Sequence, residues 1–249
     1  MKIVVGINTL TSIDQPVYSN HCQFWFRLGR SSSHDFILSH PRRMSIDNMR
    51  NMTAKIALEH NADYILFIDD DVLIPLNTVD MLLSSQADIA AGWTLIRGYP
   101  FKNMFFKFVD EGKTQLEHVK DEDLVVREGN FFCDAVGFSC TLIKVDLLRK
   151  IQVPFFVTGP YNTEDIYFCI KAVRAVPETK IVVNLDCKTS HNLGSEYIDP
   201  LNKKYYKEYY EKIYPEVLTQ KEGSPPDRQH EDSDGSPTYE EVLGEAVFK

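Results

Sequence analysis

The sequence predicts a single α/β domain with a mostly parallel central sheet, additional β-structure in its middle and a disordered acidic tail. Three observations lead to this fold class. Short apolar runs alternate with amphipathic segments over the first hundred residues, as strands buried on both faces alternate with the helices that cover them. The middle, about 100–145, holds short β-like pieces separated by charged turns. Residues 215–249 are acidic and interrupted by Gly, Ser and Pro.

The individual elements follow from the spacing of apolar residues along the chain. The predicted strands of the parallel sheet are at 3–7, 35–39, 64–68, 87–93 and 180–185. Predicted helices cover 16–28, 45–60, 75–83, a segment that starts at Thr163, and 203–214. The β-like pieces of the middle are at 105–109, 131–136 and 139–143. Within these helices, Gly29 suits a C-terminal stop, Ser45 suits an N-cap and Pro75 suits a first turn.

The charge of the chain is unevenly placed. The net charge is −9, but residues 215–249 hold nine acidic and three basic residues, which leaves −3 for residues 1–214. Tight binding to a nucleic-acid backbone needs a basic stripe that neutralises phosphates, and the near-neutral body gives no support for one. The acidic stretch cannot bury enough apolar surface to offset its ordering entropy. We therefore predict a domain over 1–214 and a disordered tail over 215–249.

The cysteines and the N-terminus bear on the compartment. Five cysteines, an odd number without a CxxC pair, disfavour a disulfide scaffold or a structural zinc site. The N-terminus enters a strand directly and lacks a signal-peptide pattern. No apolar run approaches the roughly 18 residues of a membrane span. These features predict a cytoplasmic protein with free thiols and no membrane span.

Three adjacent carboxylates, Asp69, Asp70 and Asp71, follow directly on the predicted strand at 64–68. In open α/β sheets, ligands bind just beyond the C-termini of the strands. Adjacent carboxylates repel one another, and Mg²⁺ or Mn²⁺ would relieve that repulsion while sharing its oxygen ligands with a substrate phosphate. If the strand geometry persists, Asp69 and Asp71 share a face. A solvated acidic turn is the alternative, but the flanking residues are apolar, and the triplet therefore predicts a metal and diphosphate site.

Several segments resemble the GT-A-fold glycosyltransferases, which take sugars from nucleotide donors. Asn48–Met52 and the run from Ala62 to Pro75, Ala-Asp-Tyr-Ile-Leu-Phe-Ile-Asp-Asp-Asp-Val-Leu-Ile-Pro, resemble the region of that family's acidic "DxD" motif. Val-Gly-Phe-Ser-Cys-Thr-Leu-Ile-Lys at 136–144 resembles its acceptor-side strand, and Thr-Glu-Asp-Ile-Tyr-Phe-Cys at 163–169 resembles its "ED" helix start. The order of these motifs over about 1–195 is more specific than any one of them. The resemblance implies a GT-A-type, Rossmann-like domain.

The resemblance also implies a metal site that binds Mn²⁺ or Mg²⁺. Asp69 and Asp71 would hold the nucleotide sugar and its metal, with Asp71 the more direct ligand. Asp70 belongs to the same binding site. His191, in Thr-Ser-His-Asn, resembles the late histidine that completes this metal site. Judged alone, a histidine is more often an ordinary loop residue than a ligand, and the position of His191 after a predicted strand makes the two interpretations about equal.

Other residues are implied to bind the donor or to act in catalysis. Arg50 would face the nucleotide or its diphosphate, and Thr9 would line the base pocket. Asp165 would be the catalytic base, with Glu164 beside it, although both acids also suit the positive end of a helix. Many relatives carry an acidic residue where this chain reads Ser-His-Pro-Arg-Arg at 39–43. The nucleotide therefore stays open, with uridine as the first expectation.

Together these features predict a metal-dependent glycosyltransferase that moves a sugar from a nucleoside-diphosphate sugar, first a UDP-sugar, to a hydroxyl acceptor. The expected reaction is inverting, with Asp165 taking the acceptor proton. One alternative is a nucleotidyltransferase or metal-dependent phosphohydrolase that uses the same acidic cluster. Another is a non-catalytic module that binds nucleotide sugars. The acceptor, whether glycan, protein or modified nucleobase, is not specified by the sequence.

Overall fold

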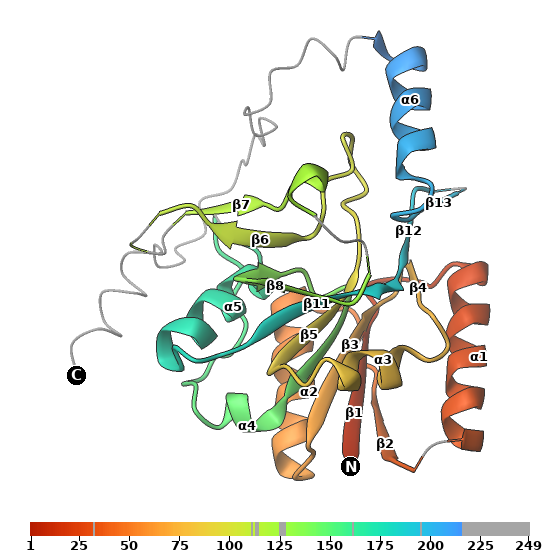
Figure 1. The fold of residues 1–249 in the computed structure, drawn as a ribbon. Coiled ribbons are helices and arrows are strands. Elements are labelled where there is room, and N and C mark those ends of the chain that lie inside the picture. The colour runs from red at the N-terminus through yellow and green to blue at the C-terminus, as the bar shows by residue number, and fades with distance from the viewer. Residues whose placement is uncertain are drawn as a thin grey trace.

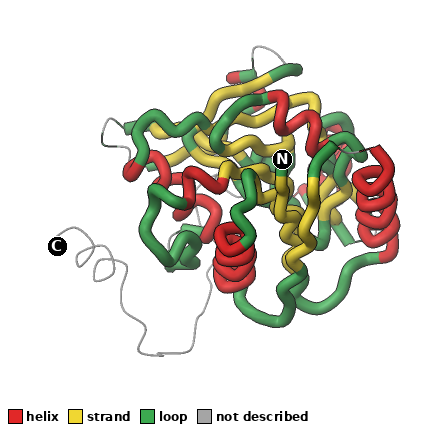
Figure 2. The backbone as a smooth tube through the Cα atoms, turned by 90° about the horizontal axis from the view of Figure 1, so that it is seen from below, coloured by secondary structure: helices red, strands yellow, loops and turns green. Residues whose placement is uncertain are grey.

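A seven-stranded sheet forms the centre of the molecule, and helices cover both of its faces (Figure 1). The computed structural model describes residues 1–31, 33–110, 112, 115–124, 128–160, 162–194 and 196–215. Seen from below, the strands lie in the middle with helices on either side (Figure 2). The strand order in the sheet is β2-β1-β3-β10-β5-β11-β8. The predicted α/β class is confirmed, and the fold is Rossmann-like.

Five strands of this sheet run in the same direction. They are β1 (Lys2–Asn8), β2 (Asp35–Ser39), β3 (Tyr64–Asp69), β5 (Ile89–Trp93) and β11 (Ile181–Lys188). Two strands from the middle of the chain run the opposite way: β8 (Asn130–Cys133) at the edge and β10 (Cys140–Lys144) between β3 and β5. The predicted middle β-structure is therefore partly built into the sheet, and one of its strands lies at the sheet's centre.

Alternating residues of the central strands supply two separate cores. The helices are α1 (Gln15–Ser31), α2 (Ile46–Glu59), α3 (Thr78–Ser84), α4 (Val145–Leu148), α5 (Glu164–Ala175) and α6 (Lys203–Ile213), with a 3₁₀ turn at Asp121–Asp123. Val5 faces α1 and packs in a cluster with Phe24, whereas Val4 faces the other side and shares a cluster with Ala54 and Phe168. Successive strand side chains point to opposite faces, so both sides of the sheet must be covered.

Two small three-stranded sheets lie beyond the carboxyl ends of the parallel strands (Figure 1). One holds β4 (Val72–Leu73), β12 (Ser190–Asn192) and β13 (Tyr197–Ile198), and the other holds β6 (Phe105–Phe108), β7 (Leu116–His118) and β9 (Ala135–Val136). In the first of them, His191 is the ladder partner of Val72. This pairing brings the late histidine beside the acidic triplet.

Three predicted boundaries are wrong. Gly29 does not end α1, because it stays helical on an open surface and the helix continues to Ser31. The short helix begins at Thr78 rather than Pro75, since the Thr78 amide and hydroxyl both bond to the Pro75 carbonyl in a turn. The predicted strand at 131–136 is divided into β8 and β9 at Asp134, whose amide and carboxylate pair with the backbone of β6.

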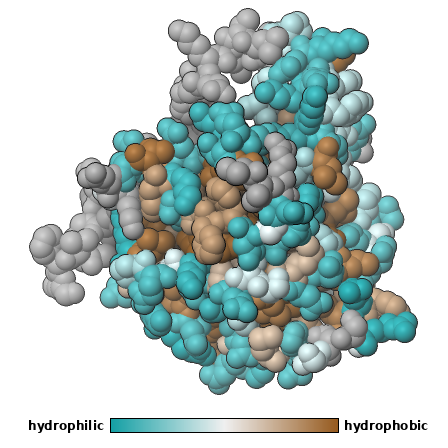
Figure 3. All heavy atoms as spheres, in the orientation of Figure 1, coloured by the Kyte–Doolittle hydropathy of each residue, from teal (hydrophilic) through white to brown (hydrophobic). Residues whose placement is uncertain are grey.

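The C-terminal helix docks through only part of its surface. Tyr206 and Tyr210 of α6 pack against a small buried cluster that contains Phe101, whereas Tyr205 and Tyr209 are exposed. The atoms over α6 are mostly hydrophilic on the face shown in Figure 3. The predicted tail at 215–249 lies outside the described residues, apart from Pro215. Within the described ranges, no helix combines the length and the apolar character that a bilayer crossing demands.

Candidate donor and metal site at the acidic turn

The first and last carboxylates of the triplet have different partners. Asp69 is the last residue of β3, and Asp70 and Asp71 form the turn that leads into β4. The strand geometry on which the expected shared face of Asp69 and Asp71 depends ends at Asp69. Both residues still line one depression at this edge of the sheet. Asp69 pairs with Arg50, while Asp71 faces His191 and Arg97. The segment 69–71 is called the acidic turn below.

Helix α1 fixes the backbone on the far side of the acidic turn. The Asn20 side chain donates to the Ile74 carbonyl (3.0 Å) and accepts from the Ile74 amide (2.9 Å). A ring nitrogen of the neighbouring His21 is 3.1 Å from the Val72 carbonyl, to which it donates. Neither residue was predicted from the sequence to belong to the site. Their only local signal is that two polar side chains interrupt a helix whose apolar face includes Val17 and Phe24.

Asp71 lies against an imidazole whose orientation is fixed. His191 Nδ1 is 2.8 Å from the Leu95 carbonyl, which can only accept, so Nδ1 carries the proton. Nε2 then faces the Asp71 carboxylate at 3.3 Å. A proton on Nε2 makes the imidazole a donor to Asp71, whereas an unprotonated Nε2 offers a lone pair that, together with the carboxylate, could hold a cation between them.

Arg97 supplies a positive charge at the same carboxylate. Its Nη1 is 3.0 Å from Asp71 Oδ2, the oxygen that also faces His191. Arg97 belongs to the loop between β5 and β6 and was not predicted from the sequence to be a site residue. The residues around a single loop arginine do not indicate which carboxylate it will contact in the folded protein.

Arg50 lies beneath the acidic turn and is fully enclosed. Its Nε donates to Glu164 (2.8 Å), its second terminal nitrogen to Asp69 (3.2 Å) and its first to the Phe138 carbonyl (3.3 Å). The guanidinium also lies over the rings of Phe67 and Phe138. In this arrangement, Arg50 orients Asp69 and Glu164, and its donors are not turned toward a diphosphate as the resemblance implied.

Asp165 is buried at the start of α5. It accepts from the Ile166 amide (2.7 Å), the Phe138 amide (3.3 Å) and the Thr163 hydroxyl. Thr163 occupies the N-cap position, but its hydroxyl goes to Asp165 and caps no backbone amide. Burial, reinforced by the charge of Glu164, raises the pKa of Asp165. The carboxylate is therefore a stronger proton acceptor than an ordinary one.

A depression opens beside the acidic turn at the carboxyl ends of β1 and β3. Its volume is about 320 Å³, within the usual range for small-molecule sites. Its lining is Asn8, Leu10, Met44, Ser45, Ile46, Met49 and the acidic turn. Asn8 is 3% exposed, and neither atom of its amide has a hydrogen-bond partner among the described residues. An unpaired buried amide is costly, so a water molecule or a ligand group is expected to complete its hydrogen bonds.

Thr9 is not among the residues that line this depression, although both of its neighbours in the chain are. Its hydroxyl is 3.0 Å from His40 Nε2, and its amide bonds to the Pro41 carbonyl. The side chains that line the depression belong to its neighbours Asn8 and Leu10. Thr9 therefore ties the end of β1 to the segment after β2, which is a different position from the base pocket that the resemblance implied.

The carboxyl groups of the acidic turn differ in their affinity for protons. Burial raises the pKa of Asp69 to about 6 against the opposing charge of Arg50, and Asp71 and Glu164 add to the rise. Burial and the charge of Asp71 raise the pKa of Asp70 to about 6. Burial acts in the same direction on Asp71, but His191 and Arg97 outweigh it and lower the pKa. Asp71 is thus the carboxylate that stays ionised.

The donor set is compatible with a divalent cation, although it is not a complete metal centre. Among the described residues, no three His, Cys, Asp or Glu side chains are grouped to hold a metal ion. Asp71 and His191 offer one carboxylate oxygen and one imidazole nitrogen that already face each other. Mn²⁺ and Mg²⁺ commonly take few protein ligands and complete their shell with phosphate oxygens and water.

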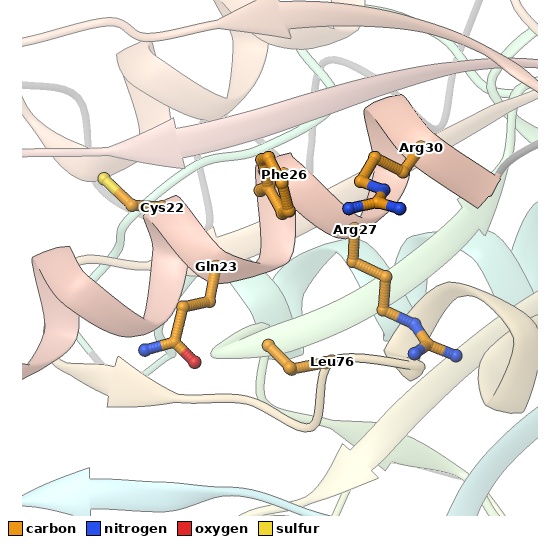
Figure 4. Close-up of a pocket in the computed structure, with 6 residues that line it drawn as sticks. All are labelled: Cys22, Gln23, Phe26, Arg27, Arg30 and Leu76. Carbon is orange, nitrogen blue, oxygen red and sulfur yellow. The ribbon is translucent and has the colours of Figure 1, made fainter.

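A second, larger hollow lies on the outer side of α1 (Figure 4). Its volume is about 650 Å³, and its lining is Cys22, Gln23, Phe26, Arg27, Arg30 and Leu76. Figure 4 shows five of these side chains spread along α1, with Leu76 opposite them. The hollow has no carboxylate in its lining, and Phe26 is 65% exposed. We therefore place the candidate active site at the acidic turn.

Comparison with known proteins supports the class of fold. No protein-family model matches the chain, and no curated protein sequence matches it. The crystal structure of A197 from STIV is similar with a TM-score of 0.55 and 17% identity, over 80% of this chain and 91% of that one. UDP-glucose pyrophosphorylase complexed with UDP-glucose has a TM-score of 0.44 and 11% identity, over 87% of this chain and 100% of that one. The first likeness concerns the fold alone, and the second is too weak to support an argument.

Proposed function

We propose that the chain is a metal-dependent glycosyltransferase whose donor is a nucleoside-diphosphate sugar. The observation that carries this proposal is the depression at the acidic turn, where the buried, unpartnered amide of Asn8 adjoins three carboxylates. An amide pairs with a base or a ribose, and carboxylates hold the cation that accompanies a diphosphate. The order of the sequence motifs adds the glycosyltransferase chemistry.

The apolar part of the depression suits the nucleoside. Met44, Ile46 and Met49 provide an apolar wall, and Asn8 provides one donor and one acceptor. Every nucleobase edge presents a donor next to an acceptor, so the amide alone does not select the base. Uridine is the first to be tested because it is the first expectation from the resemblance.

The acidic turn suits the diphosphate end of the donor. We assign the metal to Asp71 and His191, with Asp69 held nearby by Arg50. When bound, a divalent cation supplies positive charge that stabilises the departing diphosphate. His191 is held in the required tautomer by the Leu95 carbonyl, and Asp71 is the carboxylate that stays ionised.

Asp165 is assigned as the base that activates the acceptor. The acceptor oxygen forms a bond to the anomeric carbon as the bond from that carbon to the diphosphate breaks, and the hydroxyl proton passes to Asp165. The Phe138 amide and the Thr163 hydroxyl orient the carboxylate. Gly137 lies beside Asp165, and an added Cβ at this position would lie only 2.5 Å from Met104 Cε, so Met104 already occupies the space that a side chain would need.

Product analysis separates this proposal from the alternatives. The protein is incubated with UDP-, GDP-, CDP- and ADP-sugars and Mn²⁺, with Asp71→Asn as the control. Release of a nucleoside diphosphate by the wild-type protein alone supports a glycosyltransferase. Pyrophosphate formed from a nucleoside triphosphate and a sugar phosphate supports a nucleotidyltransferase, and phosphate release supports a phosphohydrolase. Binding without any turnover supports a non-catalytic module and contradicts the proposal.

A further inference from the structure

Two arginines contact the acidic turn among the described residues, and Arg97 is the one whose side chain is accessible. Its side chain is 60% exposed, compared with 25% for its partner Asp71 and 2% for Arg50. Two hydrogen bonds anchor the base of the loop that carries Arg97. The Ile96 amide donates to the Lys102 carbonyl, and the Leu95 carbonyl accepts from His191 Nδ1. The backbone near Arg97 is thus tied down, while the guanidinium extends over the acidic turn.

The Arg97 guanidinium lies where a cation is expected. It contacts the Asp71 oxygen that faces His191 Nε2, so it partly neutralises the carboxylate that a metal would bind. An arginine cannot share that oxygen with a divalent cation without repulsion between the two positive charges. Binding of a metal at Asp71 and His191 therefore favours movement of Arg97 away from the carboxylate.

We infer that Arg97 is an exchangeable cation of the donor site: it pairs with Asp71 in the metal-free protein and with the donor's diphosphate once a divalent cation has taken Asp71. The inference rests on the proposed function, because it assumes a diphosphate ligand. It adds a binding residue and a reason for the metal and the nucleotide to bind together.

The energetics permit this exchange. An ion pair with an exposed arginine contributes little to stability, so a divalent cation can replace it at small cost. A guanidinium presents a planar set of donors that matches phosphate oxygens. Arg50 cannot take this role while its donors are held by Glu164, Asp69 and the Phe138 carbonyl. By linkage, the metal raises the affinity for the diphosphate, and the diphosphate raises the affinity for the metal.

Two binding measurements on the whole protein test the inference. The first titrates Mn²⁺ alone into wild type, Arg97→Ala and Arg97→Lys by calorimetry. Loss of the competing guanidinium is expected to tighten Mn²⁺ binding by about two- to fivefold in Arg97→Ala, the scale of an exposed ion pair. Arg149→Ala is the matched control, since it removes an arginine that pairs with Asp146 on α4, away from the acidic turn.

The second measurement titrates UDP at saturating Mn²⁺. Arg97→Ala is expected to bind UDP about tenfold or more weakly, because a charge-assisted contact to the diphosphate is lost. Arg97→Lys keeps the positive charge but lacks the planar guanidinium, so its affinity for UDP is expected to lie between those of wild type and Arg97→Ala. The control Arg149→Ala binds UDP as the wild type does.

The outcomes distinguish this inference from the proposed function. Wild-type affinities of Arg97→Ala for both Mn²⁺ and UDP overturn the inference and leave the donor site intact. Weaker Mn²⁺ binding by Arg97→Ala also overturns it, since Arg97 then supports the metal rather than competing with it. A wild-type protein that binds Mn²⁺ but no nucleoside diphosphate contradicts the proposed function and, with it, the diphosphate role of Arg97. The Mn²⁺ comparison then still decides whether Arg97 competes at Asp71.

Discussion

Asp70 shows the energetic cost of the acidic turn at the scale of one residue. Burial and the charge of Asp71 raise its pKa to about 6, from 3.8 for an ordinary aspartate. Between these two values, the folded protein holds a proton that the unfolded chain has released, so stability falls as the pH rises through this window. Above about pH 6, the ionised carboxylate remains a cost to the folded state. A bound cation would relieve it.

Replacing this carboxylate should therefore stabilise the free protein. We expect Asp70→Asn to unfold at a higher temperature than wild type at pH 7.5, and at nearly the same temperature near pH 2.5, where the wild-type group is protonated in both states. The full shift corresponds to about 3 kcal/mol, and partial exposure of Asp70 reduces the expected gain to about 1 kcal/mol, or about 2–4 °C.

Thermal unfolding at the two pH values measures this difference. Asp35→Asn, at an exposed aspartate that begins β2, is the control for a general effect of removing one negative charge. A melting temperature of Asp70→Asn below that of wild type at pH 7.5 would show that Asp70 is a stabilising partner in the turn, against this account.

Asp165 tests the catalytic assignment at the same scale. Asp165→Asn preserves the size of the side chain but removes its ability to take a proton, so turnover should fall about 10²–10⁴-fold. Affinity for UDP with Mn²⁺ should stay within about twofold, because Asp165 lies at the start of α5 and does not line the depression. Turnover rates and UDP titrations measure the two effects. Equal losses of turnover and of nucleotide affinity would contradict the role of base.

The pH dependence of turnover gives a second readout of this role. Because burial raises the pKa of Asp165, the rate should decline as the pH falls through that raised value and the carboxylate gains a proton. A purely structural Asp165 would leave this acid limb of the profile unchanged in Asp165→Asn.

At the scale of elements, helix α1 holds the acidic turn in place from outside the sheet. Asn20 makes two hydrogen bonds to the backbone of Ile74, directly after β4. Asn20→Ala leaves those two backbone groups unpaired, which should cost about 1–3 kcal/mol of stability. The turn then loses its anchor, so affinity for UDP and Mn²⁺ should weaken as well.

A matched variant separates the two effects of Asn20→Ala. Asp88 bonds the Lys180 amide and the Lys144 ammonium at the amino ends of β5 and β11, the opposite edge of the sheet. Asp88→Ala should lose comparable stability, measured by urea unfolding, without any change in UDP affinity. If Asn20→Ala also keeps wild-type UDP affinity, α1 does not position the site.

The elements also show how far local sequence patterns reach. Buried runs and helical spacing predicted the five parallel strands, because the periodicity of burial is a local property. The insertion of β10 between β3 and β5 was not predicted, since the pairing order of strands depends on contacts between distant segments. For the same reason, His191 was predicted to be a metal ligand only through its resemblance to a known motif.

Local sequence patterns likewise predicted some residues of the candidate site and missed others. The acidic turn was predicted because three charges within an apolar run form a local contrast. Asn8, Asn20 and Arg97 were missed, since each is an ordinary polar residue until the fold reveals what it faces. Arg50 was predicted to lie at the site, but in contact with the nucleotide or its diphosphate. Its ion pair with Glu164 could not be predicted from the residues around Arg50, because Glu164 is distant in the sequence.

At the scale of the whole molecule, the architecture concentrates charge at one edge of the sheet. The acidic turn, the depression, His191 and Arg97 converge where β1 and β3 end and where the small sheet of β4, β12 and β13 begins (Figure 1). This is the edge at which open α/β sheets bind their ligands. The central claim is that this edge binds a nucleoside diphosphate together with a divalent cation.

Thermal unfolding with UDP, GDP, CDP and ADP, each with and without Mn²⁺, tests this claim most directly. A ligand at about a hundred times its dissociation constant stabilises a protein by roughly 2.7 kcal/mol, an increase of about 5–10 °C for a domain of this size. Such an increase is expected with one nucleoside diphosphate, only when Mn²⁺ is present and not in Asp71→Asn. No increase with any of the four, or an equal increase without Mn²⁺ and in Asp71→Asn, would contradict it.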